Sequence, residues 1–446
     1  MAPSAGSDLL IGPRPGTQET DESPGDGAPH LQVGGSARHR RGSRRVRRNR
    51  LIALLILLAM LGAGLWLGIG RGGTTTAFPP RHPHSSRRVP KASKADPRLD
   101  PDWEGDGKTA VLAFGGDVNF PSGSTLGARL AADPATALGT GVPQLLGGVD
   151  LSMVNLETAL TDGTCPDPQP KTYDFFAPAS AVTALQSAGV SLVTEANNHG
   201  EDCGQPGLQM ALTTRAQTGY TILGIGQNSD QAFAPYQTTI RGEHIAIIAA
   251  TQVIDSDLQS AWTATATQPG LASAYDVSDL VAAVEAARKV DDTVIVFLHW
   301  GVELDACPDP LQEPLANELV RAGADVVIGS HAHVLLGGGY IGSAYVDYGL
   351  GNFAFYNTPA PTDQSGSLVI AVTGRHIDSV TWRPALIEDE LPVPLSGSAA
   401  TQALQAWANA RACTDLSAAP SGSVATTQTE TSPALPAIAE ELSQDN

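Results

Sequence analysis

Five short apolar runs of this chain each lead into residues of types that bind metal ions in proteins. The residues are carboxylates, a carboxamide and imidazoles, in the order Asp117, Glu157, Asn198 with His199, His299, and His331 with His333. Runs rich in Val, Ile, Leu and Phe, bounded by Gly and polar residues, predict buried strands. Ligand sites of open α/β sheets form outside the carboxyl ends of the strands, so we expect these side chains to converge. The pattern predicts one polynuclear metal site.

His331 and His333 give the most specific local signal. Side chains two apart on an extended segment share one face, so each imidazole can reach one ion of a pair. Glu157 is suited to bridge two cations about 3.5–4 Å apart. His199 is expected to face the substrate as an acid or an anion partner. Further polar residues are expected to hold the ligands in place or to touch the substrate, namely Asn119, Asn197, Asp202, Glu303 and Asn352.

Oxygen and nitrogen donors without thiolate favour Mn, Fe or Zn over Ca or Mg. Two such ions would acidify a bridging water and neutralise the charge of a phosphate-like group. Each residue taken alone could also have a purely structural role, such as an Asp in a turn, a Glu at a helix terminus or a buried His in a loop. The hypothesis of a metal site therefore depends on the whole set of residues. No G-x-S-x-G elbow, phosphate-binding loop or H-E-x-x-H motif offers another chemistry.

The elements that must position these residues alternate between strands and helices, the pattern of α/β architecture. Short apolar runs in 220–250 and 343–374 predict an antiparallel contribution to a mixed sheet, or a second sheet. Helical spacing of apolar residues, with polar starts and Gly near the ends, predicts helices over 178–189, 207–219, 276–290 and 310–324.

The net charge of −19 is unevenly distributed along the 446 residues. Residues 1–106 contain 16 Lys and Arg against 10 Asp and Glu, a balance of +6. Residues 107–446 contain 11 against 36, a balance of −25. Such an acidic body is expected to repel nucleic acid and other anionic polymers except where cations intervene, so we expect no nucleic-acid partner.

A basic segment and an apolar segment near the N-terminus predict a membrane anchor. Residues 38–50 carry eight arginines, and residues 51–70 contain no charge. About 20 apolar residues suffice to cross a bilayer as a helix. The positive-inside rule places the N-terminus in the cytoplasm and the main domain outside the cell membrane. The alternatives are a buried core helix and a cleaved signal peptide, for which 74–77 offers only a weak cleavage site.

Composition changes along the chain predict five parts. They are a disordered basic cytoplasmic segment (1–50), a transmembrane signal anchor (51–70), an extracellular Pro/Ser-rich linker (71–106), the main domain (107–392) and a largely disordered C-terminal extension (393–446).

All four cysteines follow the predicted anchor, so they lie on the exported side, where disulfides form. We expect two disulfides whose pairing the sequence leaves open, among Cys165, Cys203, Cys307 and Cys413. Bridges at Cys203 and Cys307 would pin loops near the proposed site. Zinc binding by all four is the alternative, although no C-x-x-C pair occurs.

Six blocks taken in order resemble the CapA family of bacterial poly-γ-glutamate capsule biosynthesis proteins, which have a calcineurin-like metallophosphoesterase fold. The blocks are GGDVNF, VNLETAL, EANNHGEDCG, LHWGVEL, IGSHAHV and YGLGNFAF, between about residues 109 and 360. The resemblance implies a four-layer α/β/β/α sandwich with two divalent metal ions. It implies metal-ligand positions at Asp117, Glu157, Asn198, His299, His331 and His333, and a catalytic histidine at His199.

The chain departs from the metallophosphoesterase pattern at two points. That pattern has Asp-x-His where this chain has Asp117-Val118-Asn119, and Gly-Asp where it has Asn155-Leu156-Glu157.

Three functions are open at this point. The first is a membrane-anchored extracellular metal-dependent hydrolase acting on a phosphoester or on a γ-glutamyl amide of the polymer. The second is a non-catalytic, metal-containing component of capsule polymer export or attachment. The third is a cell-surface domain with a structural metal. The resemblance also implies partners among the capsule synthesis and export proteins.

Overall fold

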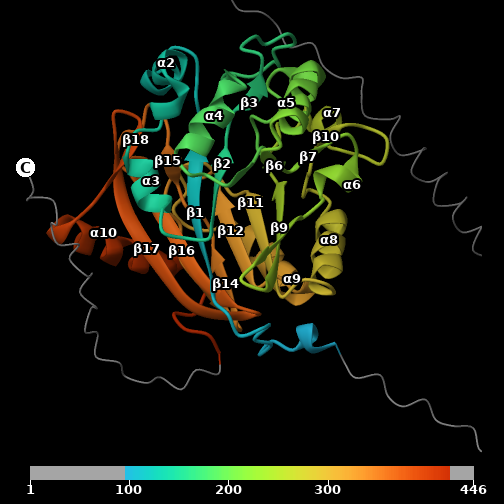
Figure 1. Cartoon of the computed structure of the whole chain (residues 1–446), viewed down its shortest axis with the longest axis vertical. Helices are drawn as coiled ribbons and strands as arrows, with labels where there is room; N and C mark the ends of the chain where they lie inside the picture. Colours follow the sequence, from blue (N-terminus) through green and yellow to red (C-terminus); the bar gives the residue numbers. More distant parts are fainter. Residues whose placement is uncertain (1–95, 422–446) are drawn as a thin grey trace, which may run out of the picture. The chain divides into compact units, whose positions relative to one another are not determined.

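The structure, a computed structural model, describes residues 96–421, and two β-sheets form its centre (Figure 1). The predicted membrane-spanning segment 51–70 and the predicted segment 1–50 lie outside the described residues. Within 96–421, no helix is long and apolar enough to cross a bilayer.

The larger sheet has eight strands. β1, β2, β5 and β6 are parallel to one another, whereas β16, β17 and β18 continue the sheet in antiparallel pairs, and β15 pairs in parallel with the end of β1. The order is β18 (Leu391–Pro394), β17 (His376–Glu388), β16 (Gln364–Thr373), β1 (Ala110–Val118), β2 (Leu151–Leu156), β5 (Leu192–Thr194) and β6 (Thr221–Leu223), with β15 at Asn352–Ala354.

The second sheet has six strands. Its four inner strands are parallel and its two edge strands antiparallel. The order is β13 (Gly338–Ile341), β14 (Ala344–Asp347), β12 (Val326–Ser330), β11 (Thr293–His299), β9 (Glu243–Thr251) and β8 (Tyr236–Ile240). Two small ladders pair β3 (Ala159–Thr161) with β4 (Phe176–Pro178), and β7 (Ile225–Gly226) with β10 (Gly270–Leu271).

The predicted helices form at the expected places. α5 and α9 both end at a glycine in the left-handed conformation, and at Gly323, where φ is +118°, a residue with a Cβ would be strained. The helices are α2 (Thr125–Ala132), α3 (Gly141–Leu146), α4 (Ser180–Ser187), α5 (Gly204–Thr218), α6 (Ser229–Ala232), α7 (Gln259–Trp262), α8 (Ser278–Arg288), α9 (Gln312–Ala322) and α10 (Gly397–Ala410), with 3-10 turns η1 (Pro97–Leu99), η2 (Pro134–Thr136) and η3 (Arg411–Cys413).

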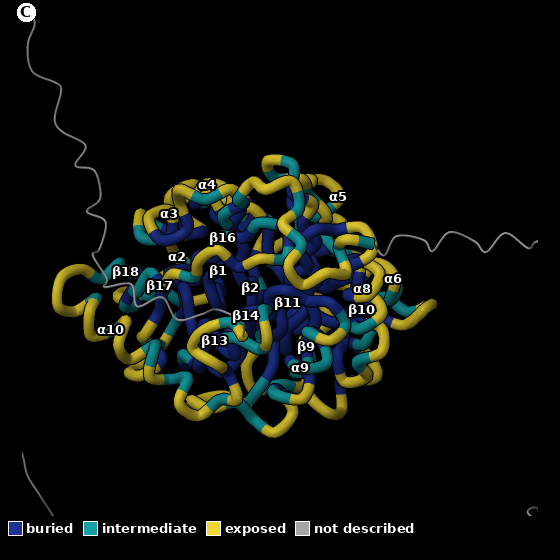
Figure 2. The backbone as a smooth tube through the Cα atoms, turned by 90° about the horizontal axis from the view of Figure 1, so that it is seen from below, coloured by how far each residue is buried: buried dark blue, intermediate teal, exposed yellow. Residues whose placement is uncertain are grey.

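Three apolar cores set the layers. Along β9, Ile245 and Ile247 enter the core between the two sheets, while Ala246 and Ile248 enter the core beneath α8 and α9. A third core packs α2, α3, α4 and α5 on the outer face of the larger sheet. Because strands buried on both faces need no polar alternation, they read as continuous apolar runs, and Figure 2 shows them buried. The mixed α/β class is therefore confirmed, with helices outside two packed sheets.

The described fold extends beyond both expected domain boundaries. Before residue 107, the Trp103 indole donates to Asp292 at 3.0 Å, which holds part of the predicted linker against the domain. After residue 392, Trp407 of α10 stacks on Trp382 with ring centroids 5.7 Å apart, and Leu416 is buried. This hydrogen bond and these apolar contacts therefore add 96–106 and 393–421 to the folded domain.

Candidate metal centre

The carboxyl ends of parallel strands from both sheets meet at one edge, and the candidate residues gather there. Asp117 comes from the end of β1, Glu157 follows β2, and the Asn197–Asp202 loop follows β5. From the other sheet, His299 ends β11 and the His331–His333 loop follows β12. Contacts join the two groups, since the His331 N–H donates to Asp117 Oδ2 at 3.2 Å. The convergence predicted from the strand ends is present in the structure.

A close backbone contact places Asp117, which lies within β1 and not just after it as the sequence suggested. The pairing of β1 with β2 shifts register between Phe114 and Asp117. At Gly116 a Cβ would stand 1.8 Å from the Gly351 carbonyl oxygen, so only glycine fits. The Asn155 amide then donates to Asp117 Oδ1 at 2.8 Å and leaves Oδ2 turned toward the histidines.

Glu157 is fully buried, and neither of its carboxylate oxygens has a hydrogen-bond partner. Its Oε1 lies 3.8 Å from His199 Nε2 and 3.8 Å from His333 Nε2. Burial raises the pKa of Glu157 well above its usual range. A buried charge without partners is costly unless a cation is bound beside it. Glu157 thus has the environment of a metal ligand.

Nitrogen donors crowd together on the other side of the site. His299 Nε2 lies 2.8 Å from Asn198 Oδ1 and 3.1 Å from His331 Nδ1. Burial lowers the pKa of His299 well below its usual range and, with the charge of His333, lowers the pKa of His331 to about 3. Both imidazoles are therefore neutral, which is the form that binds metals.

The backbone of His331 and His333 differs from the expected extended segment. β12 ends at Ser330, and the two histidines have φ of +96° and +57°. Positive φ is uncommon for residues with a Cβ and costs about 1–3 kcal/mol, a strain often found at functional sites. Their rings still lie 6.0 Å apart, so a bent loop achieves the shared placement that we had expected of a strand.

His333 lies between the carboxylates. Its Nδ1 is 3.5 Å from Asp117 Oδ2 and 2.9 Å from Asn352 Oδ1. Burial alone would lower the pKa of His333, but the charges of Glu157 and Asp117 raise it to about 10. Asn352 also donates to the His333 and Thr362 carbonyls, so it holds the imidazole in place. A proton on His333 therefore compensates the negative charge of the neighbouring carboxylates, as a bound cation would.

Among the described residues, two groups of side chains could each hold a metal ion, and within each group the ligand atoms lie within 4.8 Å of one another. One is formed by Asp117, Glu157 and His333, and the other by Glu303, His331 and His333. The exposed Glu303, expected to hold a histidine or to touch substrate, is thus placed as a direct ligand candidate. The donor set of carboxylates, carboxamide and imidazoles, with unpaired oxygens on Glu157, fits divalent transition-metal ions.

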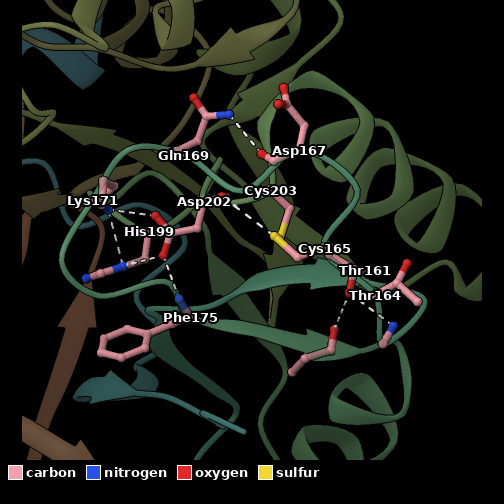
Figure 3. The surroundings of a disulfide bond; sticks show 12 residues. Thr161, Thr164, Cys165, Asp167, Gln169, Lys171, Phe175, His199, Asp202 and Cys203 are labelled. Atoms are coloured by element: carbon pink, nitrogen blue, oxygen red, sulfur yellow. Dashed lines mark hydrogen bonds and ion pairs between the residues drawn. A yellow bond between two sulfur atoms is a disulfide. The ribbon is translucent and has the colours of Figure 1, made fainter.

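His199 is held by a polar network of Asp202 and Lys171, of which the sequence predicted only Asp202 (Figure 3). Its Nδ1 lies 2.5 Å from Asp202 Oδ2, as expected for an orienting carboxylate. Lys171 pairs with Asp202 Oδ1 at 2.6 Å, lies 3.3 Å from His199 Nδ1 and donates to the Asn198 carbonyl. Burial lowers the pKa of His199. Lys171 is a lone lysine in a long loop, and no sequence signal marks it.

Asn197 and Asn119, which we expected to hold the ligands in place or to touch the substrate, make hydrogen bonds within the protein. Asn197 donates to Asn155 Oδ1 at 3.0 Å and accepts from the His199 N–H at 2.9 Å, which fixes the loop. Asn119 is buried, and its Oδ1 accepts from the Tyr356 N–H at 3.4 Å. Its amide oxygen is therefore engaged by the backbone of another loop.

Both disulfides brace loops of the site, as the spacing suggested. Cys165 pairs with Cys203, next to Asp202, and Cys307 pairs with Cys413, the last residue of η3 (Figure 3 draws the first). The described residues contain no free cysteine, so zinc binding by all four is wrong.

Comparisons with known proteins match the chain to capsule proteins. A family model described as "Bacterial capsule synthesis protein PGA_cap" matches residues 111–357. The chain is 32% identical over 188 residues to a capsule biosynthesis protein CapA of Bacillus anthracis, covering 42% of this chain and 45% of that protein. It is 31% identical over 192 residues to a probable polyglutamine synthesis accessory protein of Mycobacterium tuberculosis, covering 41% and 50%. The chain spans about half the length of the curated relatives it matches.

Solved structures give weaker likenesses. One is the NAD nucleotidase of Haemophilus influenzae, with a TM-score of 0.38 and 13% identity, covering 67% of this chain and 55% of that one. Another is a putative 5'-nucleotidase of Staphylococcus aureus, with a TM-score of 0.37 and 12% identity, covering 67% and 58%. At these scores the likenesses carry no argument about activity.

Proposed function

Because the chain belongs to the PGA_cap family of bacterial capsule synthesis proteins, we propose that it serves poly-γ-glutamate capsule biosynthesis as a dinuclear metal-dependent hydrolase. The observation that carries the hydrolase proposal is the environment of Glu157. This residue is buried beside Asp117 and His333, and neither of its carboxylate oxygens has a hydrogen-bond partner. The bond cleaved is a phosphoester or a γ-glutamyl amide.

The residues have separate roles in this proposal. Two divalent ions, of Mn, Fe or Zn type, would supply an acidified water and would neutralise charge on the group attacked. The proposed ligands are Asp117, Glu157, Asn198, His299, His331 and His333, with Glu303 added by the geometry.

His199 is the proposed acid. Asp202 engages Nδ1, so Nε2 is left as the atom that can hold a proton for the leaving group. Lys171 compensates the charge of Asp202 and keeps this carboxylate in place, which orients the imidazole.

We also propose that residues 51–70 anchor the protein and that its folded domain lies outside the cell membrane. The two disulfides support this location, because such bonds persist in oxidising compartments. The eight arginines before the apolar run support a cytoplasmic N-terminus.

The test is metal analysis and turnover of the full-length chain in detergent. We expect about two equivalents of bound metal and metal-dependent hydrolysis of phosphoester or γ-glutamyl substrates. His331→Ala should reduce turnover at least a hundredfold, whereas His376→Ala, at an exposed histidine paired with Asp378, should leave it unchanged. Bound metal and polymer binding without turnover would instead support a non-catalytic role in polymer export or attachment.

A further inference from the structure

A cavity of about 330 Å³ opens beside the candidate metal centre. His199, His333 and Glu303 line it on the side of the candidate ligands, and Tyr173 and Tyr356 are among its other lining residues. A volume of this size matches the lower end of small-molecule pockets. Any substrate part attached to a group at the metal centre would therefore meet this cavity first.

Aromatic rings form much of the cavity wall. Phe175 is buried and packs on His199, with ring centroids 4.2 Å apart. It also makes edge contacts with Phe355 at 6.3 Å and with Tyr356 at 5.4 Å. Phe175 thus packs against three other rings of the cavity wall. Tyr173, by contrast, is 61% exposed, and Tyr356 is half-buried, so both rings keep surface that a ligand can cover.

The cavity wall beyond the candidate ligands offers a polyanion no basic side chain. No Lys or Arg lines the cavity, and the Glu303 carboxylate does. Lys171 lies behind His199, with its side chain 6% exposed and paired with Asp202. A poly-γ-glutamate chain carries one carboxylate per residue, and beyond the candidate metal centre these carboxylates would find no Lys or Arg along the cavity to pair with. Aromatic faces instead favour flat, uncharged groups.

We propose that this cavity is a subsite for an uncharged ring, so that the substrate is a phosphomonoester of a ring-bearing alcohol and not the polymer itself. The inference rests on the proposed hydrolase function and narrows its substrate class. The phosphate group would lie at the candidate metal ligands, and the ring would lie against Tyr173 and Tyr356.

Binding of two non-hydrolysable phosphonates tests the subsite without relying on turnover. 2-Phenylethylphosphonate carries a ring, and propylphosphonate does not. Calorimetry on the full-length chain with Mn²⁺ should show tighter binding of the ring compound. Tyr173→Ala and Tyr356→Ala should each weaken it by about two- to tenfold, and leave propylphosphonate unchanged. Tyr173→Phe and Tyr356→Phe should retain the preference, as should Tyr275→Ala, at an exposed tyrosine outside the cavity.

The outcomes separate the two proposals. Turnover of phosphoesters with equal binding of both phosphonates overturns the subsite and leaves the hydrolase. A ring preference that depends on both tyrosines, without turnover, supports the subsite and overturns the hydrolase. Binding of neither phosphonate, or a preference that both alanine variants retain, overturns the subsite.

Discussion

At the scale of single residues, Glu157 is a buried carboxylate without hydrogen-bond partners that lies among the candidate metal ligands. Both of its oxygens are buried without a partner, and a partnerless buried polar group destabilises a folded protein by roughly 1–3 kcal/mol, more if charged. The Glu157 carboxylate therefore does not stabilise the fold by itself, and its position at the junction of two strand ends has another reason. Ligation of an ion is the reason that the neighbouring histidines and Asp117 support.

Glu157→Gln should therefore separate metal binding from folding. The variant should lose most of its bound metal, while the metal-free variant should melt no lower than the metal-free parent, because burial disfavours a charged carboxylate at this position. Metal should stabilise the parent by about 2.7 kcal/mol per ion at a hundredfold excess over Kd, and the variant far less. Metal analysis and thermal melts check both.

Glu195→Gln, at another buried glutamate with unpaired oxygens, is the control and should keep its metal. Equal metal content in the two variants would contradict the assignment.

The buried pair of Lys171 and Asp202 gives a second prediction. Lys171→Met leaves Asp202 buried and unpaired, so the free energy of unfolding should fall by about 3–5 kcal/mol. Adding Asp202→Asn should recover part of this loss. Lys108→Met, which breaks an exposed pair with Asp106, should cost less than about 1 kcal/mol. Urea unfolding of the variants measures these differences, and similar losses at both lysines would refute the buried-pair account.

At the scale of elements, one loop holds His199 in place. The segment from Cys165 to Phe175 carries Lys171, and the Phe175 N–H donates to Asp202 at 2.6 Å. The Cys165–Cys203 bond closes this segment onto the loop that holds His199 (Figure 3). The disulfide thus joins two parts of one polar network.

Replacing Cys165 and Cys203 together by Ala should lower the free energy of unfolding by about 2–4 kcal/mol, because the bond spans 38 residues of sequence. Turnover should fall further than with Cys307→Ala/Cys413→Ala, whose bond lies farther from His199 in sequence and joins the C-terminal segment. Denaturant unfolding and kinetic assays on both double variants check this. A larger loss of turnover in the second would contradict the bracing role.

The strand β14 gives a pH prediction. Burial raises the pKa of Asp347 to about 7, and the Gly349 N–H offsets this only in part. The folded state therefore holds a proton that the unfolded state releases near pH 4. The stabilising effect is complete below that pH and is lost as pH rises to about 7, by on the order of 4 kcal/mol.

Asp347→Asn should abolish this contribution, so the difference in unfolding free energy between parent and variant should change between pH 4 and 7. It should be constant above pH 8. Chemical unfolding across this range measures it, and a constant difference at every pH would refute the prediction.

At the scale of the whole molecule, the folded domain is larger than composition suggested. α10 covers Trp382, which is only 3% exposed, and Cys413 bonds Cys307. Tyr340 and Ser417 also exchange backbone hydrogen bonds at 2.8 and 3.0 Å. An Ala-rich, Ser-rich and Thr-rich stretch resembles a tail by composition, but these contacts make it part of the domain.

A chain ending at residue 394 and carrying Cys307→Ser should therefore lose about 2–4 kcal/mol of stability, because Trp382 becomes exposed. A chain ending at 421 keeps every contact named here and should unfold like the full chain. Thermal melts and tryptophan fluorescence of the two truncations check this, and equal stability would place the boundary near 392 after all.

The strands and the main helices were predictable because each reflects a local pattern. Runs such as TVIVFLH are apolar throughout since β11 is buried on both faces, and 207–219 closes at a glycine as helices commonly do. The types of ligand residue were predictable for the same reason, because they follow the runs directly. The bent loop at His331 was not, since left-handed backbone leaves little mark on sequence outside glycine.

The sequence by itself determined which residues end the strands, and hence which side chains gather at the edge where ligands bind. Only the tertiary structure decided how they are partnered. The salt link of Lys171, the placement of Glu303 among the ligand candidates, the engagement of Asn119 and the pairing of the cysteines all join segments far apart in the chain. Contacts of this kind depend on how distant loops and strands pack in three dimensions, which local composition does not encode.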